Sequence, residues 1–497
     1  MSGGDFMSGI AGIRSSKRQD LVHLMLQKIS YRGSSEPLIW SGTEASFGIT
    51  GFQNIDETIK PLMTPSGERV IVWDGHLINA PELQEQLSKH NLSGATDAEI
   101  VLHFYEELGS RALGNLEGEF AFAIMDGSRL LMARDRLGIR PLYYGFYDGA
   151  LIFASEIKAL SDFAVSVHEF PPGCFFISDQ GIFPYRPYQP ESIRLNGATE
   201  SADRLGDLLV QATDACIPEG VSIGVWLSGG VDSSVIAALG NRKCDELYTF
   251  SAGVKDAPDL DYAEQVAEHI GSHHFTRNFN QEEALKVLDK VIYHLESFDA
   301  PLVRSAIGNY LVAELASEHV PFVLSGEGGD ELFAGYAYQK DYASEIELTL
   351  SVQNAIAALH NTALQRVDRS AAAHGTQVGL PFLDPRVVRF ALAIPSRWKI
   401  RGPQDVEKWP LRKAFADELP SEVIWRGKSK FWEGAGITDL IASHAESEIS
   451  DTSFANERQL GDGSILFSKE ELLYFRIFSL HFGEKVPIEE VGRTKHI

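Results

Sequence analysis

Cysteines, long apolar runs and targeting signals are scarce or missing in this chain. Its 497 residues include three cysteines, Cys174, Cys216 and Cys244, too few and too widely spaced for a disulfide framework or a zinc site. No apolar run approaches the roughly 20 residues that a membrane span needs. The first residues, MSGGDFMSGIAG, lack the basic and apolar segments of a signal peptide. We therefore expect a cytoplasmic protein with no membrane partner.

Basic residues are also few relative to acidic ones. Lysine and arginine together number 44, against 69 aspartates and glutamates, so the formal net charge is −25 at pH 7. Such a chain repels a phosphate backbone, and we expect no nucleic-acid partner. A small acidic substrate is not excluded, because its site needs only local positive charge. The ordinary hydrophobic content of 44% and the chain length predict a globular protein of two to four domains.

The pattern of apolar runs changes twice along the chain. Residues 1–165 hold short strand-like runs separated by turns, with two helix-like segments, which predicts an α+β sandwich. Residues 166–195 are rich in proline and are expected to form a linker. Residues 196–497 begin with strands alternating with helices, the pattern of a doubly wound parallel α/β sheet, and continue with a mostly helical C-terminal part.

The most informative motif is LSGGVDSS, residues 227–234. It follows the apolar run 221–226, typical of a buried strand, and precedes the apolar helix pattern 235–239. A strand, a glycine-rich turn and a helix together present backbone N–H groups and a helix N-terminus to an anion. The motif lacks the lysine of a Walker P-loop, which argues against a γ-phosphate kinase. SGGxDS indicates instead the pyrophosphate loop of enzymes that cleave ATP between its α and β phosphates.

A second polar motif, SGEGGDE, covers residues 325–331 and follows the apolar run 320–324. The carboxyl ends of parallel strands line one crevice of an open α/β sheet, so both motifs should face the same ligand. Asp232 and Asp330 then supply carboxylates from separate loops. Hard oxygen ligands of this kind suit Mg²⁺ bound to a triphosphate.

These motifs, with LPFLDP at 380–385, WRGKSKFWEGAG at 425–436 and LQRVDRSAAAHG at 364–375, resemble the asparagine synthetase family over nearly the whole chain. The N-terminal half is similar to the glutaminase domain of that family in YRG at 31–33 and RDRLGIRPLYY at 134–144. The resemblance implies an Ntn-hydrolase-like sandwich followed by an adenine nucleotide α-hydrolase-like sheet. It also implies an enzyme that adenylates a carboxylate with ATP, releases pyrophosphate and lets a nitrogen nucleophile displace AMP.

The resemblance assigns roles to individual residues. It implies a nucleotide site of Leu227, Ser228, Gly229, Gly230, Asp232, Ser233, Ser234, Ser251 and Gly326, with Asp232 and Asp330 as Mg²⁺ ligands. Lys428 matches the essential lysine of the family, a cation that would offset charge on the α-phosphate and departing pyrophosphate. Arg366 matches an arginine of the second-substrate pocket, where a guanidinium can clamp a carboxylate. Asp299 and Arg304 match a segment near the acyl-adenylate.

Glu327 separates two branches of the resemblance. An amine that attacks an acyl-adenylate must lose a proton, and a carboxylate at this place can accept it. Amide-forming asparagine synthetases carry glutamate here, whereas the ring-closing β-lactam synthetase branch reads SGYG. The chain departs from the family at 377–380, where QVGL replaces the usual E-x-R-V. If the missing charged pair shapes the pocket, a bulkier or differently charged acid than aspartate fits.

The N-terminal half has lost the residues of glutamine hydrolysis. Ser8 stands where the family has its nucleophilic cysteine, and seven residues precede it, so no free α-amine acts as base unless the chain is cut after Met7. Asp74-Gly75 replaces the Asn-Gly of the oxyanion hole. His76 replaces a glutamate, and the arginine that grips the glutamine carboxylate is absent from 47–51. Asp97 alone remains of the substrate-binding set, so we expect an inactive glutaminase-like domain.

These features predict an ATP-dependent amide-forming ligase that uses ATP and Mg²⁺. It would join an aspartate-like acid to ammonia or an amine, without glutamine hydrolysis. One alternative is a specialised biosynthetic amide synthetase, of natural-product or lasso-peptide-cyclase type, that joins another acid to an amine. A third is a catalytically silent regulator that binds nucleotide. The oligomeric state stays open, with a homodimer among the alternatives.

Overall fold

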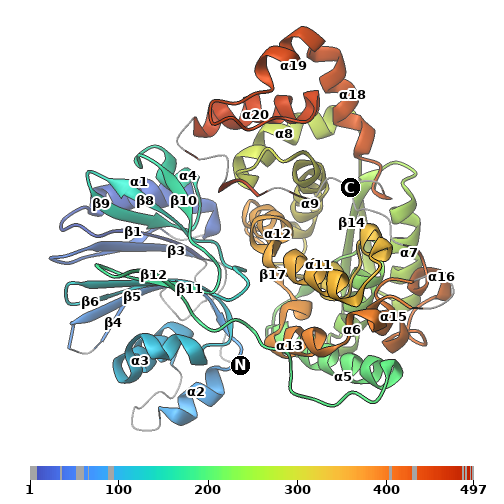
Figure 1. The fold of residues 1–497 in the computed structure, drawn as a ribbon, viewed down its shortest axis with the longest axis horizontal. Coiled ribbons are helices and arrows are strands. Elements are labelled where there is room, and N and C mark those ends of the chain that lie inside the picture. Colours follow the sequence, from blue (N-terminus) through green and yellow to red (C-terminus); the bar gives the residue numbers. More distant parts are fainter. Residues whose placement is uncertain are drawn as a thin grey trace. The chain divides into compact units, whose positions relative to one another are not determined.

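The structure is a computed structural model that describes residues 8–33, 36–51, 61–64, 66–87, 95–401, 406–427, 434–483, 486, 490–492 and 494. It divides into two compact units. The first extends to Pro187 and includes Ser479–Glu490, and the second comprises Tyr188–Phe478 and Val491–Ile497. Each unit is described by itself below, with element labels as in Figure 1.

The first unit contains two six-stranded sheets, with strand orders β10-β8-β9-β1-β3-β2 and β12-β11-β7-β6-β5-β4. All of their pairings are antiparallel; for example, Ser8 pairs with Gly51 across β1 and β3. The strands up to residue 154 are β1 (Ser8–Ile13), β2 (Leu38–Ser41), β3 (Ser46–Gly51), β4 (Leu62–Met63), β5 (Arg69–Leu77), β6 (Gly118–Asp126), β7 (Arg129–Arg134), β8 (Tyr143–Tyr147) and β9 (Ala150–Ala154).

Four helices cover the outer faces of these sheets: α1 (Gln19–Lys28), α2 (Ala80–Gln86), α3 (Asp97–Leu108) and α4 (Lys158–Ser161). One apolar core lies between the sheets and contains Phe47, Val72 and Phe153. A second lies between the other face of the β5–β7 sheet and α3, where Trp73 stacks on Phe120 at 5.6 Å between ring centroids. The predicted α+β sandwich is therefore confirmed.

Residues 166–195, expected to form a linker, instead contribute three strands to the sheets: β10 (Val167–Glu169), β11 (Cys174–Ile177) and β12 (Gly181–Pro184). Strands of three or four residues are too short to show the alternation that sequence patterns reveal. Pro184 fits because β12 is an edge strand, where a missing N–H breaks no ladder. The compact unit accordingly ends at Pro187.

The second unit is built on a five-stranded parallel sheet with the order β15-β14-β13-β16-β17. Its strands are β13 (Ile223–Trp226), β14 (Tyr248–Val254), β15 (His273–Phe279), β16 (Phe322–Leu324) and β17 (Gln377–Gly379). The chain builds the sheet outward from β13 in one direction and then from β16 in the other. The strand order thus reverses between β13 and β16, where open α/β sheets bind ligands. The predicted doubly wound sheet is confirmed.

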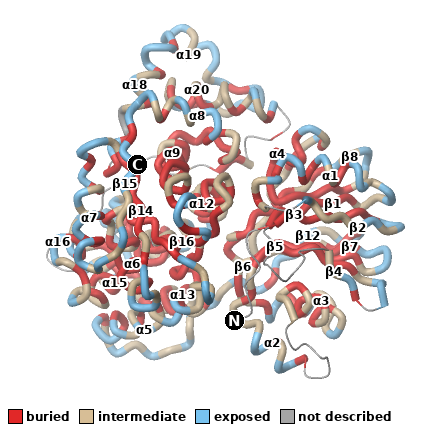
Figure 2. The backbone as a smooth tube through the Cα atoms, turned by 180° about the vertical axis from the view of Figure 1, so that it is seen from behind, coloured by how far each residue is buried: buried red, intermediate tan, exposed pale blue. Residues whose placement is uncertain are grey.

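The helices of the second unit surround this sheet and form the C-terminal part, as predicted (Figure 1). They are α5 (Ala198–Cys216), α6 (Val231–Lys243), α7 (Pro258–Ile270), α8 (Gln281–Leu295), α9 (Ala300–Ser317), α10 (Gly329–Leu332), α11 (Glu345–Ala357), α12 (Ala363–Ala372), α13 (Pro385–Ala393), α14 (Ser396–Lys399), α15 (Trp409–Ala414), α16 (Ser421–Ile424), α18 (Thr438–Glu448), α19 (Asp451–Glu457) and α20 (Lys469–Phe482). Helix α9 is buried along most of its length (Figure 2). Within the described parts of the chain, no helix combines the length and the apolar character that crossing a membrane requires.

Candidate functional site

A cavity of about 550 Å³ lies where the strand order reverses. Its walls include both glycine-rich loops, the one after β13 and the one after β16. Helix α9, residues 336–338 and the region from the end of α11 to the start of α12 also contribute to the lining. The two sequence motifs therefore face one cavity, as their positions after parallel strands predict.

Hydrogen bonds between two of its own serines fix the conformation of the loop after β13. The Ser228 N–H donates to Ser233 Oγ at 3.2 Å, and the two hydroxyl oxygens lie 3.0 Å apart. Gly229 has a φ of 70°, and a Cβ there would lie 2.6 Å from Tyr262 Cβ. Only glycine satisfies both conditions. The loop then enters α6 at Val231, so the N-terminus of that helix faces the cavity, an arrangement suited to phosphate.

The loop after β16 packs directly on the first loop. A Cβ on Gly326 would lie 2.7 Å from Ser233 N, and one on Gly329 would lie 2.6 Å from Asp232 Oδ1. Gly326 is thus required by the close approach of the two backbones, and Gly329 by its contact with the Asp232 side chain. This approach brings the carboxylates of Asp232 and Asp330 to the same part of the cavity.

Lys408 lies between these two carboxylates, a residue that our sequence analysis missed. Its Nζ is 2.6 Å from Asp330 Oδ1 and donates a hydrogen bond to Asp232. The side chain is buried, which lowers the pKa of Lys408, but the two carboxylates more than offset this and raise it above its ordinary value. Lys408 is 176 residues from Asp232 in sequence, and no motif that we identified contains it. An ammonium therefore sits between the residues predicted to bind Mg²⁺.

The donor set fits a magnesium ion that is held jointly with a nucleotide. Asp232 and Asp330 offer hard oxygen ligands, and Gly329 leaves room beside Asp232 Oδ1 that a Cβ would fill. Within the described residues, no cluster of three or more histidine, cysteine or acidic side chains could hold a metal. Mg²⁺ would therefore take its other ligands from phosphate oxygens and water, as it commonly does.

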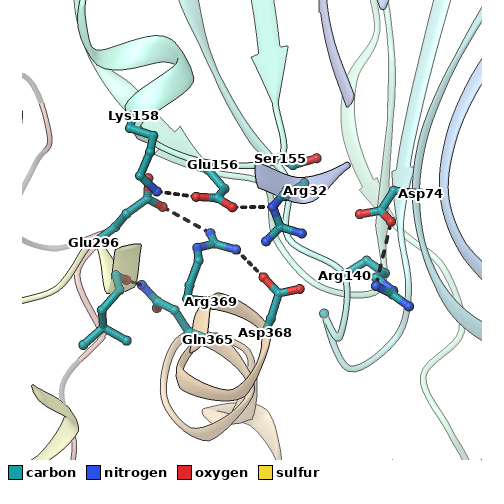
Figure 3. Close-up of polar contacts among 12 residues, drawn as sticks. Arg32, Asp74, Arg140, Ser155, Glu156, Lys158, Glu296, Gln365, Asp368 and Arg369 are labelled. Carbon is teal, nitrogen blue, oxygen red and sulfur yellow. Dashed lines mark hydrogen bonds and ion pairs between the residues drawn. The ribbon is translucent and has the colours of Figure 1, made fainter. Parts of the chain in front are cut away.

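Glu327 and Arg366 form an ion pair at the cavity wall. The sequence analysis predicts separate roles for them, a proton acceptor and a clamp for a substrate carboxylate. Glu327 follows β16, and Arg366 lies on α12. Two contacts on the same helix hold α12 in place (Figure 3): Arg369 Nη2 donates to Glu296 Oε2 at 3.2 Å, and Gln365 Nε2 donates to Leu295 O at 2.6 Å. The Arg366 guanidinium is thus positioned by its helix and already engages a carboxylate.

Glu331 also lines the cavity, and the sequence analysis predicts no role for it. Its side chain is 4% exposed, and Tyr336 donates its hydroxyl proton to one carboxylate oxygen. Burial, followed by the charges of Asp330 and Glu327, raises the pKa of Glu331 to about 7. The other oxygen, Oε2, is buried and has no hydrogen-bond partner among the described residues.

The remaining predicted residues divide between the cavity and other places. Ser251 lines the cavity and donates to Leu227 O at 2.5 Å, which ties β14 to the first loop. Ser234 is buried in α6, and Lys428 lies outside the described residues. Asp299 caps α9, accepting from Leu302 N at 3.2 Å, and Arg304 Nε donates to Glu470 at 2.8 Å; neither lines the cavity. The altered segment 377–380 forms β17 with its first three residues, and none of its four residues lines the cavity.

In the first unit, Ser8 and Asp74 contact each other at the start of β1. Ser8 is 4% exposed, and its hydroxyl oxygen is 3.1 Å from Asp74 Oδ1 and 3.2 Å from Trp73 O. Ser8 N–H donates to the same Asp74 oxygen at 3.2 Å. Arg140 Nη1 lies 3.8 Å from Asp74 Oδ1 (Figure 3). The carboxylate thus lies against the hydroxyl, where the resemblance would place an oxyanion donor.

Asp97 is engaged by residues of its own unit. Its Oδ2 accepts from Leu77 N at 2.8 Å and lies 3.0 Å from His76 Nδ1. Burial lowers the pKa of His76, but its hydrogen bond and charge interaction with Asp97 prevail and raise it. The residue predicted to survive from the glutamine site therefore has a partner that the resemblance does not include.

Comparison with known proteins agrees with this geometry. A family model described as asparagine synthase matches residues 204–351 and 346–475, and one described as glutamine amidotransferase domain matches residues 7–177. The chain belongs to the asparagine synthase family. The first model covers the whole cavity-forming part of the sheet, including both glycine-rich loops.

Curated members of the family are similar to the chain over most of its length. Asparagine synthetase [glutamine-hydrolyzing] 2 of Oryza sativa subsp. japonica is 32% identical, covering 95% of this chain and 84% of the relative. Asparagine synthetase [glutamine-hydrolyzing] 3 of Arabidopsis thaliana is 33% identical, over 85% and 77%. A probable asparagine synthetase [glutamine-hydrolyzing] of Dictyostelium discoideum is 32% identical, over 98% and 96%. The predicted enzyme class, an ATP-dependent carbon–nitrogen ligase, is confirmed.

Proposed function

We propose that this ligase adenylates a carboxylic acid and passes the acyl group to ammonia or an amine, without hydrolysing glutamine. One observation carries the proposal: a single cavity joins the pyrophosphate loop, the Asp232–Asp330 pair and Glu327. ATP and the acyl-adenylate need to occupy the same place in succession, and a shared cavity allows this without release of the intermediate.

The first step forms a bond between a carboxylate oxygen and the α-phosphorus of ATP and breaks the bond to the pyrophosphate. Backbone N–H groups of the loop at Ser228 to Gly230 and the N-terminus of α6 stabilise the charge that gathers on the leaving pyrophosphate. Asp232 and Asp330 would hold Mg²⁺, which would neutralise the phosphates. Lys408 keeps these two carboxylates together until then, because its ammonium offsets their repulsion.

The second step forms the amide. A nitrogen attacks the acyl carbon, the carbon–oxygen bond to AMP breaks with its electron pair on AMP, and the nitrogen gives up a proton. Glu327 accepts this proton, and its ion pair with Arg366 fixes the orientation of the carboxylate. Lys428, through the family resemblance, supplies positive charge at the α-phosphate during the first step.

Glutamine hydrolysis is excluded from the proposal because of Ser8 and Asp74. A serine hydroxyl is a weaker nucleophile than the thiol of a cysteine, and the Ser8 hydroxyl already donates its hydrogen bond to Asp74. A carboxylate also opposes the negative charge of a tetrahedral intermediate instead of stabilising it. The relatives named above carry glutamine hydrolysis in their names, so the nitrogen source is where this chain would differ.

A second candidate is a specialised amide synthetase that joins an acid other than aspartate to a larger amine. Two observations favour it. Arg366, the predicted clamp for a substrate carboxylate, is already paired with Glu327. The cavity lining also includes Tyr336, Tyr338 and small residues such as Ala355 and Ala358. These side chains suit a substrate with an apolar group better than a free amino acid.

The test is pyrophosphate release with ATP and Mg²⁺ across a panel of acids, each with ammonium, glutamine or no nitrogen source. We expect release with at least one acid, product with ammonium or an amine, and none with glutamine as the nitrogen donor. Lys428→Ala should abolish the release. Pyrophosphate release that survives in this variant would contradict the proposed adenylation site. Amide formation with glutamine as the nitrogen donor would contradict the proposal that the enzyme does not hydrolyse glutamine.

A further inference from the structure

Two buried polar atoms of cavity-lining residues, Trp226 Nε1 and Glu331 Oε2, have no hydrogen-bond partner among the described residues. Glu331 Oε2 is buried and accepts no hydrogen bond from any residue that the structure describes, although its carboxylate lines the cavity. Burying a carboxylate oxygen without a partner costs free energy, so a protein retains one where a ligand supplies the missing donor. The other oxygen is taken by the Tyr336 hydroxyl, which fixes the carboxylate in place.

The charges around Glu331 favour a cationic ligand. Four acidic residues line this part of the cavity, namely Asp232, Glu327, Asp330 and Glu331. Arg366 pairs with Glu327, and Lys408 pairs with Asp232 and Asp330. No ion pair links Glu331 to a lysine or arginine within the described parts of the chain. Mg²⁺ would belong to the Asp232–Asp330 pair, so among the described residues Glu331 has no counter-charge of its own.

The wall beside Glu331 is aromatic and otherwise made of small residues. The Tyr336 and Tyr338 rings stack with centroids 5.6 Å apart and an interplanar angle of 15°. Ala337, Ala355 and Ala358 also line the cavity. Flat rings and methyl groups offer an apolar surface, and a tyrosine face also attracts a cation. Ammonium ion alone would leave this surface unused.

We propose that Glu331, Tyr336 and Tyr338 form the subsite for the nitrogen nucleophile, and that the nucleophile is a primary amine with an apolar or aromatic body. The amine would bind as its ammonium, with an N–H donated to Glu331 Oε2 and its body against Tyr338 and Ala358. This inference rests on the proposed function and adds the class of its second substrate. The bound ammonium first passes one proton to Glu331, which frees the nitrogen lone pair for attack. The covalent step then stays as described above, with Glu327 accepting the second proton.

The first experiment measures binding by calorimetry in the presence of Mg²⁺ and α,β-methylene-ATP, a nucleotide that the enzyme cannot cleave between these phosphates. Phenethylamine is the probe, methylamine tests the contribution of the apolar body, and 3-phenylpropionate carries a similar body with the opposite charge. We expect phenethylamine to bind about tenfold or more tightly than either. Equal or tighter binding of 3-phenylpropionate, or no preference over methylamine, overturns the inference.

Two variants locate the binding. Glu331→Gln keeps the shape of the side chain but removes its charge, and should weaken phenethylamine about tenfold or more while nucleotide binding persists. Glu347→Gln, an exposed acid on α11 outside the cavity, is the matched control and should change nothing. Ala358→Trp fills the apolar wall and should weaken phenethylamine but not methylamine, a test that does not depend on Glu331→Gln folding. Wild-type phenethylamine affinity in both Glu331→Gln and Ala358→Trp overturns the inference.

Acid-dependent exchange of radioactive pyrophosphate into ATP separates this inference from the proposed function. If exchange is present but Glu331→Gln binds amines as tightly as the wild type, the amine subsite is contradicted and the adenylation proposal stands. Absence of exchange with every acid of the panel contradicts adenylation, whatever the amine-binding result.

Discussion

Glu327 accepts a hydrogen bond from Arg366 across the wall of the cavity. The two residues come from a loop after β16 and from α12, 39 positions apart in sequence. The proposed proton acceptor is therefore held by a guanidinium, and the guanidinium is not free to clamp a substrate carboxylate unless this pair opens. This relationship gives Glu327 a fixed orientation and limits what the pocket can recognise.

Glu327→Gln is expected to separate the two chemical steps. The amide keeps a hydrogen bond to Arg366 but cannot accept a proton, so the rate of amide formation should fall about 100-fold or more. Acid-dependent pyrophosphate exchange should stay within about twofold of the wild type, because adenylation needs no base at this place. Product formation and exchange are measured on the same preparation, and an equal loss of both would contradict a role confined to the second step.

Lys408→Met should leave Asp232 and Asp330 facing each other without a cation. Breaking a buried ion pair by removing one partner costs about 3 kcal/mol or more, so we expect a lower free energy of unfolding in urea. Added Mg²⁺ should recover part of this loss in the variant and have a smaller effect on the wild type. Lys413→Met, on the helix α15 that begins directly after Lys408 but outside the cavity, serves as control. A variant as stable as the wild type, or insensitive to Mg²⁺, would argue against this arrangement.

Ser8→Cys should not restore glutaminase activity, even when residues 1–7 are removed so that the new cysteine has a free α-amine. Asp74 Oδ1 lies 3.1 Å from the side-chain oxygen of Ser8, and its charge would oppose both thiolate and oxyanion. Glutamate release from glutamine is the measurement, with a buffer blank as reference. Release above the blank would show that Asp74 and the missing arginine do not prevent hydrolysis.

Lys399 predicts a dependence of stability on pH. Burial lowers the pKa of Lys399 from 10.5 to about 7, and the unfolded chain therefore binds this proton more tightly than the folded one. Between about pH 7 and 10.5 the unfolded state carries more protons, so stability should rise with pH across this window. Urea unfolding at pH 7 and pH 9 measures the rise, which we expect to be about 2 kcal/mol or more from this residue.

Lys399→Met should remove most of this rise. It should also raise the free energy of unfolding at pH 7, because methionine carries no charge that has to be buried or neutralised. Lys286→Met, at an exposed position on α8, is the matched control and should leave the pH dependence unchanged. The same slope in wild type and Lys399→Met would place the titrating group elsewhere.

The nucleotide end of the cavity could be predicted from sequence because its features are local. LSGGVDSS and SGEGGDE each follow a short apolar strand, and parallel strands place such loops at one edge of the sheet. The glycines at 326 and 329 are also explained by close contacts between these two loops, and the glycine at 229 by its positive φ and its contact with α7. Short-range pattern and one topological rule were enough for this part.

The roles of two charged residues of this cavity, Lys408 and Glu331, could not be predicted from sequence. Lys408 reaches Asp232 from 176 positions away, and nothing in its neighbouring sequence marks it as a cavity residue. Glu331 stood in an identified motif, but its burial, its contact with Tyr336 and its unpartnered oxygen depend on how α10 and residues 336–338 pack. Strands β10, β11 and β12 likewise appear only once longer strands offer them edges to pair with.

The sequence by itself determined the family and the order of the two folds, since these depend on residue identity and local periodicity. Only the tertiary structure decided which charges neutralise one another: Arg366 with Glu327, Lys408 with Asp232 and Asp330, and none with Glu331 among the described residues. Ion pairing depends on distances of a few ångströms between side chains from different elements. Those distances are set by packing of the whole unit, which no short segment of sequence specifies.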